Sequence, residues 1–215
     1  MTTIAHQGIM LLAFMLVVTL VHICGTVIAC LACRLKVEGV SVFYGKSVMT
    51  IQTPLCPVTI GCLPCGGSVS FDSEDFEKRP FLVRSVVVLS GAFAMLLLAG
   101  LCLRIDIATS QFAEGFSQIV MGAVAPLDHG TPLVRAFFER ANESLVVGCG
   151  IFAAKFTALN MFPIPPVTGG RLLGEIPRHR PKGDIWMWCN VIGVILVSLL
   201  GLCWLAALVN HWWHL

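Results

Sequence analysis

Two ionisable side chains interrupt apolar stretches that otherwise contain no Asp, Glu, Lys or Arg. His22 lies within residues 8–33, and Lys155 lies within residues 144–162. An ionisable group inside a membrane-spanning segment is costly and marks a functional site by default. A buried histidine bonded to a neighbouring helix is an equally common explanation for His22. Position alone therefore leaves its role open.

A loop with an unusual sequence follows the second of these stretches. Residues 160–173 read "NMFPIPPVTGGRLL", with Pro163, Pro165 and Pro166 followed by Gly169 and Gly170. Proline lacks a backbone donor and its ring clashes with the preceding helical turn, so the chain must leave the helix here. Non-helical backbone at membrane depth is tolerated only where protein buries it or water reaches it. The loop is therefore a candidate binding element.

Both segments resemble motifs of the site-2 protease family of intramembrane zinc metallopeptidases. His22-Ile23-Cys24-Gly25-Thr26 lies in the frame of the family's H-E-x-G-H. "NMFPIPPVTGG" is similar to the family's N-x-x-P-x-P-x-x-D-G-G loop. Asn160, Pro163, Pro165, Gly169 and Gly170 are in register with it, and Thr168 occupies the position of the aspartate. "LPCGGSV" at 63–69 is similar to a P-x-G-G-x-V turn. The resemblance covers most of the chain in order.

The resemblance implies chemistry that this chain does not carry at the matching positions. In the family, two histidines and the loop aspartate bind zinc, and the glutamate deprotonates the zinc-bound water. Here His22 is present, whereas Ile23, Thr26 and Thr168 stand at the other three positions. We expect no catalytic residue to be intact and no metal to bind, with His22 the sole matching ligand if zinc is bound.

Nearby cysteines do not replace the missing ligands. Cys24 lies about 200° around the helix from His22, and Cys30 and Cys33 lie roughly 12 and 16 Å further along the axis. Loop cysteines Cys56, Cys62 and Cys65 contain one C-x-x-C pair, which is a weak metal or redox signal without a second pair or a histidine. Their role stays open.

Lys155 permits two interpretations. Its ammonium could fill the vacated metal pocket beside His22, or it could snorkel or pair with another chain. Because none of the expected spans contains an acidic residue, an anion for Lys155 must come from another chain, a loop end or lipid.

The composition indicates a polytopic membrane protein. The 215 residues are 57% hydrophobic and 12% charged, with a net charge of +2 and a mean hydropathy of +0.87. The small net charge and the absence of a basic run exclude nucleic acid as an expected partner. Apolar stretches of about 20 residues predict four transmembrane helices, at about 8–33, 82–103, 144–162 and 186–209.

The connections predict the topology and one small sheet. Connections 34–81 and 163–185 are rich in Lys and Arg, including a cluster at 178–182, whereas 104–143 has fewer and the tails have none. The positive-inside rule places both termini on the outer side.

Alternating residues and turn glycines in 34–81 predict a cytoplasm-facing hairpin. Segment 104–143 is predicted to be an amphipathic, partly helical surface segment. The whole chain, 1–215, is expected to be a single domain.

These observations favour a catalytically inactive, site-2-protease-like membrane protein. It would bind or scaffold a transmembrane segment or a membrane complex, in contact with the bilayer of a bacterial inner membrane. The alternative is an active zinc metalloprotease with a divergent site. An ion or small-molecule pathway is disfavoured, because the spans lack acids and no transporter-like repeat is visible.

Overall fold

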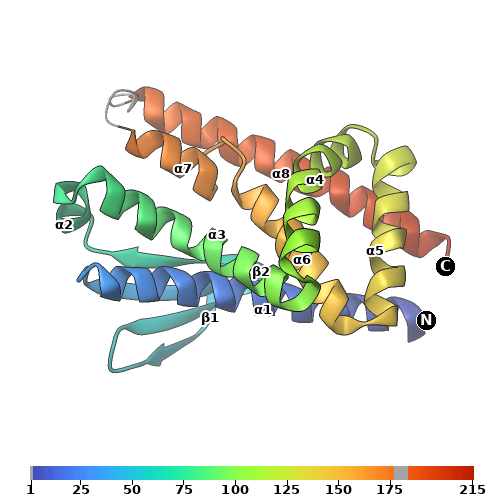
Figure 1. The fold of residues 1–215 in the computed structure, drawn as a ribbon, viewed down its shortest axis with the longest axis horizontal. Coiled ribbons are helices and arrows are strands. Elements are labelled where there is room, and N and C mark those ends of the chain that lie inside the picture. Colours follow the sequence, from blue (N-terminus) through green and yellow to red (C-terminus); the bar gives the residue numbers. More distant parts are fainter. Residues whose placement is uncertain (1, 177–183) are drawn as a thin grey trace.

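The computed structural model describes residues 2–176 and 184–215. It is a helical bundle with one small sheet at its side (Figure 1). In chain order the elements are α1 (Thr2–Ala32), β1 (Val37–Gln52), β2 (Pro57–Phe71), α2 (Ser73–Lys78), α3 (Phe81–Leu103), α4 (Ile105–Val124), the π-helix η1 (Pro126–Gly130), α5 (Thr131–Glu143), α6 (Leu145–Asn160), α7 (Thr168–Glu175) and α8 (Asp184–Trp213). The cluster at 178–182 lies outside the described residues.

Among the described residues, three helices are long and apolar enough to cross a membrane, which confirms a polytopic membrane fold. They are α1, α3 and α8. The expected span at 144–162 corresponds to α6, an apolar helix of only 16 residues. It ends at Asn160 because the prolines that follow cannot continue a helix. Both termini lie at one end of the molecule and α2 lies at the other (Figure 1).

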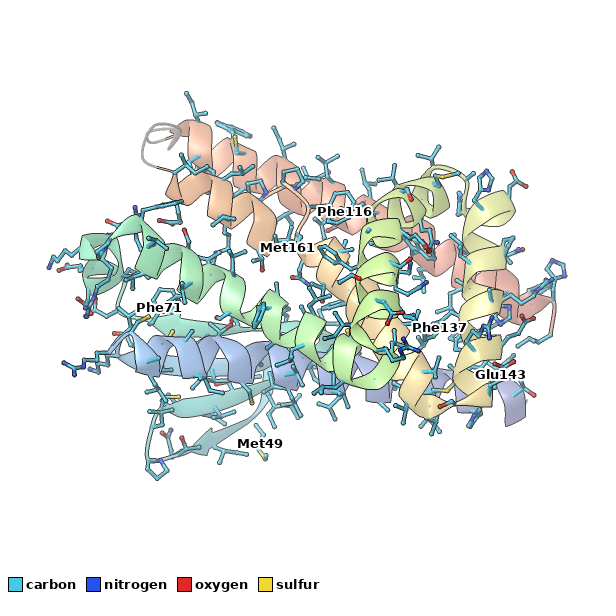
Figure 2. The ribbon with its side chains drawn as sticks, in the orientation of Figure 1. Met49, Phe71, Phe116, Phe137, Glu143 and Met161 are labelled. Atoms are coloured by element: carbon cyan, nitrogen blue, oxygen red, sulfur yellow. The ribbon has the colours of Figure 1, made fainter. Side chains whose placement is uncertain are left out.

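The sheet lies between α1 and α3 in the sequence, as predicted. Its two strands pair antiparallel, with Val37 facing Phe71 and Gln52 facing Pro57. Val40 is in register with both Val69 and Val58, so the bent strands pair twice with irregularities between. The sheet packs on the last turns of α1 through a shared apolar cluster. The strand that carries Met49 projects away from the helices (Figure 2).

Helix α3 is the centre of the bundle, because it packs against α1, α4, α6 and α7. Its buried Met95 and Ala99 share an apolar cluster with Val18 of α1 and Ala154 of α6. A second cluster joins α1, α5 and α8 around Phe138. Close van der Waals packing in these contacts holds the helices together.

Helix α4 differs from the surface segment predicted for 104–143. It is helical as expected, but it packs into the bundle against α3, α6 and α8. A Cβ built on Gly115 would lie 2.7 Å from the Cβ of Ala158, so the backbones of α4 and α6 approach closely. Small residues permit this approach in membrane helix pairs. The periodic pattern of α4 therefore reflects packing between helices.

Candidate functional site

One face of α1 carries the polar residues of the site. Thr19, His22 and Thr26 are spaced by three and four residues, which places them on one side of the helix. All three line the same cavity. The Thr26 hydroxyl donates to the His22 carbonyl oxygen at 3.0 Å, within its own helix. Thr19 is 1% exposed, and its Oγ1 has no hydrogen-bond partner among the described residues.

The imidazole of His22 lies directly against the backbone of α3 at Gly91. A Cβ built on Gly91 would come within 2.4 Å of His22 Cε1 and 2.5 Å of Nδ1. Beside it, a Cβ built on Gly25 would lie 2.6 Å from the Cβ of Ala94. Two glycines therefore allow α1 and α3 to approach at the level of the histidine. Any side chain at position 91 would compete with the ring for space.

Ile23, at the position matching the family's glutamate, is not among the residues that line the cavity. It is 5% exposed and belongs to the apolar cluster between α1, the sheet and α3. Its Cδ1 lies close to Gly67 of β2, where a built Cβ would be only 2.7 Å away. Position 23 therefore contributes to packing of the sheet on α1 and offers no base to the cavity.

The proline and glycine loop connects α6 to α7 and packs against itself. Asn160 ends α6, and its Nδ2 donates to the Phe156 carbonyl oxygen at 2.9 Å. A Cβ built on Gly169 would lie 2.3 Å from the Met161 carbonyl oxygen. One built on Gly170 would lie 2.2 Å from the Ile164 carbonyl carbon. Only glycine fits both places, so the first turn of α7 lies flat on the loop.

The loop also lies against the first third of α8. A Cβ built on Gly193 would overlap the Pro165 carbonyl oxygen at 1.5 Å. Gly193 is eight residues beyond Ile185, the start of the α8 span, or about 12 Å along the helix. The loop therefore lies inside the depth spanned by α8. Protein covers one of its sides, as non-helical backbone at that depth requires.

A cavity of about 370 Å³ joins the two motifs. His22 and Thr26 line it from α1, Asn160 and Pro166 from the loop region, and Thr168 from the start of α7. The remaining predicted loop residues, Pro163, Pro165, Gly169 and Gly170, do not line it, although the glycines shape its wall. Figure 2 shows Met161, at the end of α6, in the middle of the molecule near this loop.

The donors in this cavity do not fit zinc. Catalytic zinc takes three protein ligands, drawn from imidazole, carboxylate and thiolate. The lining residues supply one imidazole, and no Asp, Glu or Cys is among them. The Thr26 hydroxyl is already bonded to the backbone. Within residues 2–176 and 184–215, no three His, Cys, Asp or Glu side chains come together as a metal site.

The Cys65 side chain lies outside the described part of the structure, and Cys56 and Cys62 belong to no metal-binding group among the described residues. Cys56 is buried in the apolar cluster between α1 and the sheet, whereas Cys62 is exposed, and both are free thiols. The burial of Cys56 is typical of a small apolar packing residue.

Lys155 is paired with Glu114 of α4. The Lys155 Nζ and the Glu114 Oε2 are 4.0 Å apart. Glu114 also accepts a hydrogen bond from Ser110 at 2.9 Å and one from Gln118 at 3.3 Å. Lys155 is not among the residues that line the His22 cavity. The negative charge that pairs with Lys155 therefore comes from α4 of the same chain. The sequence did not reveal that α4 packs against α6.

Another ion pair, which is largely buried, anchors the loop helix. Arg84 of α3 pairs with Glu175 at the end of α7, and the two side chains are 11% and 14% exposed. Arg84 Nη2 also lies 3.4 Å from the Glu175 carbonyl oxygen. Because α7 begins at Thr168, this pair holds the helix that carries Thr168 onto α3.

Several lining residues were not singled out from the sequence. Arg171, one of the basic residues of the 163–185 connection, lines the cavity. Thr19 was overlooked, although its spacing of three residues from His22 on one helix face could have revealed it. Residues 66–69 of β2 form another wall, and they fall within the "LPCGGSV" turn noted above.

The comparisons with known proteins agree with this architecture. No curated protein matches the chain. The sequence model of peptidase family M50 matches residues 10–200, a range that contains the α1 face, the sheet, the loop and most of α8. The chain therefore belongs to peptidase family M50, the site-2 protease family.

Proposed function

We propose that this protein is a catalytically inactive member of its family that binds a membrane-embedded segment of a partner protein. The segment would enter the cavity between α1 and the proline and glycine loop and remain uncut. The partner is another transmembrane protein or a membrane complex.

One observation carries this proposal: the cavity unites the positions of the family's metal site but contains a single imidazole as a zinc ligand. His22, Thr26 and Thr168 line it together, whereas Ile23 is packed in an apolar cluster. Without zinc, no bound water acquires a pKa near 7. Loss of a general base alone costs about 10²–10⁴ in rate. These two losses act on the same step and therefore compound.

The binding half of the proposal is supported by the shape of the loop. Gly169, Gly170 and Gly193 leave no room for a Cβ, so the loop backbone is fixed between α7 and α8. A volume of about 370 Å³ is within the range of ligand pockets, about 300–1,000 Å³. A preformed wall beside such a cavity lowers the cost of ordering a bound segment.

Zinc content is the first test. The protein is purified in mild detergent without chelator, and zinc per chain is measured by elemental mass spectrometry, with His22→Ala in parallel. We expect negligible zinc in both. Stoichiometric zinc that disappears in His22→Ala would instead support the alternative function, an active zinc metalloprotease whose further ligands come from outside the described residues.

Restoring the missing side chains tests how near the scaffold is to activity. The variant combines Ile23→Glu, Thr26→His and Thr168→Asp. We expect it to bind zinc where the natural chain does not. Because position 23 lies in an apolar cluster, its glutamate will be poorly placed, and hydrolysis of a membrane-anchored substrate should stay weak. Stoichiometric zinc in both the restored and the natural protein would contradict the proposal.

We further propose that the protein lies in a bacterial inner membrane with both termini on the periplasmic side. The proposal rests on the Lys and Arg bias of the connections. Single-cysteine labelling with a membrane-impermeant reagent, in a variant lacking the natural thiols, tests it. A cysteine at Met49 should react only after the membrane is opened, and one at His214 should react in intact spheroplasts.

A further inference from the structure

The cavity beside His22 contains a positive charge without a matching negative one. Arg171 is among its lining residues, and no aspartate or glutamate is. Arg171 is exposed as well as lining the cavity, so its guanidinium is accessible to a ligand. A bound carboxylate would give it a matching charge and charge-assisted hydrogen bonds.

The acid best placed to neutralise Arg171 is already engaged. Glu175 lies one helical turn further along α7, at the i+4 position where an ion pair usually forms. It pairs instead with Arg84, and both of those side chains are largely buried. Residues 177–183, which follow α7, include no acidic residue. Within the described part of the chain, Arg171 has no ion-pair partner.

Unused hydrogen-bond donors face the same cavity. Thr168 is 7% exposed and lines the cavity, and its side chain makes no hydrogen bond among the described residues. Thr19, on the opposite wall, is 1% exposed and is likewise without a partner there. Buried hydroxyls are normally bonded. The Thr168 oxygen is not among the buried polar atoms that lack a partner, so Thr19 is the exception of this kind. Both hydroxyls remain able to donate to a ligand in the cavity.

The start of α7 adds to this donor set. Thr168 is the first residue of the helix, and Val167 before it provides no side-chain cap. The first amide groups of a helix lack partners within the helix and carry partial positive charge. Gly169 and Gly170 do not line the cavity, so a negative group beside Thr168 would meet the positive end of the helix, the Thr168 hydroxyl and the Arg171 guanidinium.

The rest of the lining distinguishes among anions. Most of the other lining residues are apolar, including Met15, Phe156, Leu159 and Val197. Inorganic phosphate would leave these surfaces unused. A peptide segment brings apolar side chains together with a carboxylate.

We infer that the cavity recognises a carboxylate of the bound segment, an acidic side chain or a free C-terminus, through Arg171, Thr168 and the first turn of α7. This rests on the proposed function, because it specifies the chemistry of the segment that the protein binds. Arg171 supplies the charge, and Thr168 donates one hydrogen bond. The site would thus take an anionic ligand where the family's metal site has a cation.

The test compares two peptides that differ in one group. A short Leu- and Ala-based peptide, labelled with a fluorophore at its N-terminus, is made as the free acid and as the C-terminal amide. Binding to the full chain in phosphatidylcholine nanodiscs is followed by fluorescence anisotropy. We expect the acid to bind about tenfold more tightly, because a hydrogen bond to a charged group contributes about 1.5–3 kcal/mol.

Variants assign the preference to the residues. Arg171→Gln should abolish the difference between acid and amide, Arg171→Lys should restore part of it, and Thr168→Val should reduce it. Arg104→Gln is the matched control, because Arg104 is an exposed arginine whose nearest acid is Asp106, and the difference should persist. The ratio is measured within each variant, so a general loss of folded protein cannot imitate the result.

Other outcomes overturn the inference in distinguishable ways. If acid and amide bind equally to the natural chain, the protein binds peptides but does not read a carboxylate. If neither peptide binds, the proposed function fails as well. If the preference is lost in phosphatidylglycerol nanodiscs, a lipid phosphate occupies the site and the assignment to a peptide is wrong.

Discussion

The α1 turn around His22 and the loop before Thr168 face one cavity, but different forces hold them. The α1 turn is fixed by side chains: the His22 ring lies on Gly91, and Ile23 enters an apolar cluster. The loop is fixed by backbone, because carbonyl groups of Met161, Ile164 and Pro165 occupy the space where a Cβ would lie. Side chains adjust to substitution more readily than backbone does. The loop should therefore be the less tolerant wall.

Gly193→Ala should have the largest effect. The new Cβ would overlap the Pro165 carbonyl oxygen, and relieving such overpacking costs about 3 kcal/mol or more when backbone must move. We expect a clear fall in the midpoint of thermal unfolding in detergent. Gly201→Ala, on the same helix with nothing within 4 Å of its Cβ, is the control and should be neutral or slightly stabilising. Equal effects of the two changes would refute the backbone contact.

Glu175→Gln should have the next largest effect. It leaves the Arg84 guanidinium largely buried without its counter-charge, which we expect to cost about 2 kcal/mol after allowing for its residual exposure. Thermal unfolding measures the loss, and the double variant with Arg84→Met should recover part of it. Glu74→Gln is the control, because its pair with Lys78 is exposed. No difference between the two Glu→Gln variants would show that the α3–α7 pair adds nothing.

Gly91→Ala tests the contact between the His22 ring and α3 and should lower the stability less than the two changes above. The methyl group would collide with the His22 ring, which can turn within the cavity, so we expect a loss of about 1 kcal/mol. Combining it with His22→Ala should remove most of the penalty. The interaction energy from this double-mutant cycle isolates the contact. An additive result would mean that the ring does not press on α3.

Lys155→Met should have the smallest effect. The Lys155 ammonium is at the limit of ion-pair distance from a half-exposed Glu114, and apolar replacement of a partly buried charge is often neutral. We expect a change of less than about 0.5 kcal/mol in stability. Zinc content and peptide binding should also be unchanged, since Lys155 does not line the cavity. Loss of peptide binding would bring back the interpretation that Lys155 fills the metal pocket.

The parts of the fold that follow local patterns were predictable from the sequence. Apolar length predicted α1, α3 and α8, and alternation with turn glycines predicted the hairpin. The prolines predicted where α6 ends. Each of these depends on a few neighbouring residues and on solvent, so no tertiary information is needed.

The parts of the site that depend on packing were not predictable in the same way. That His22 and Thr168 share a cavity followed from the resemblance, and nothing in their spacing required it. The pairing of Lys155 with Glu114 depends on the close approach of α4 and α6, which one glycine permits. From the sequence, Arg171 is an ordinary interfacial arginine. The cavity that it lines forms only when α7 packs against α3.

The short length of α6 has a consequence for any segment that enters the cavity. Sixteen residues span about 24 Å, less than a hydrocarbon core of about 30 Å, so the helix ends before the bilayer does. Water that reaches the loop backbone at that depth can also solvate the peptide groups of a visiting chain. In lipid, each unpaired peptide group costs several kcal/mol. Here a visiting helix could unwind one turn and exchange its own hydrogen bonds for water at little net cost.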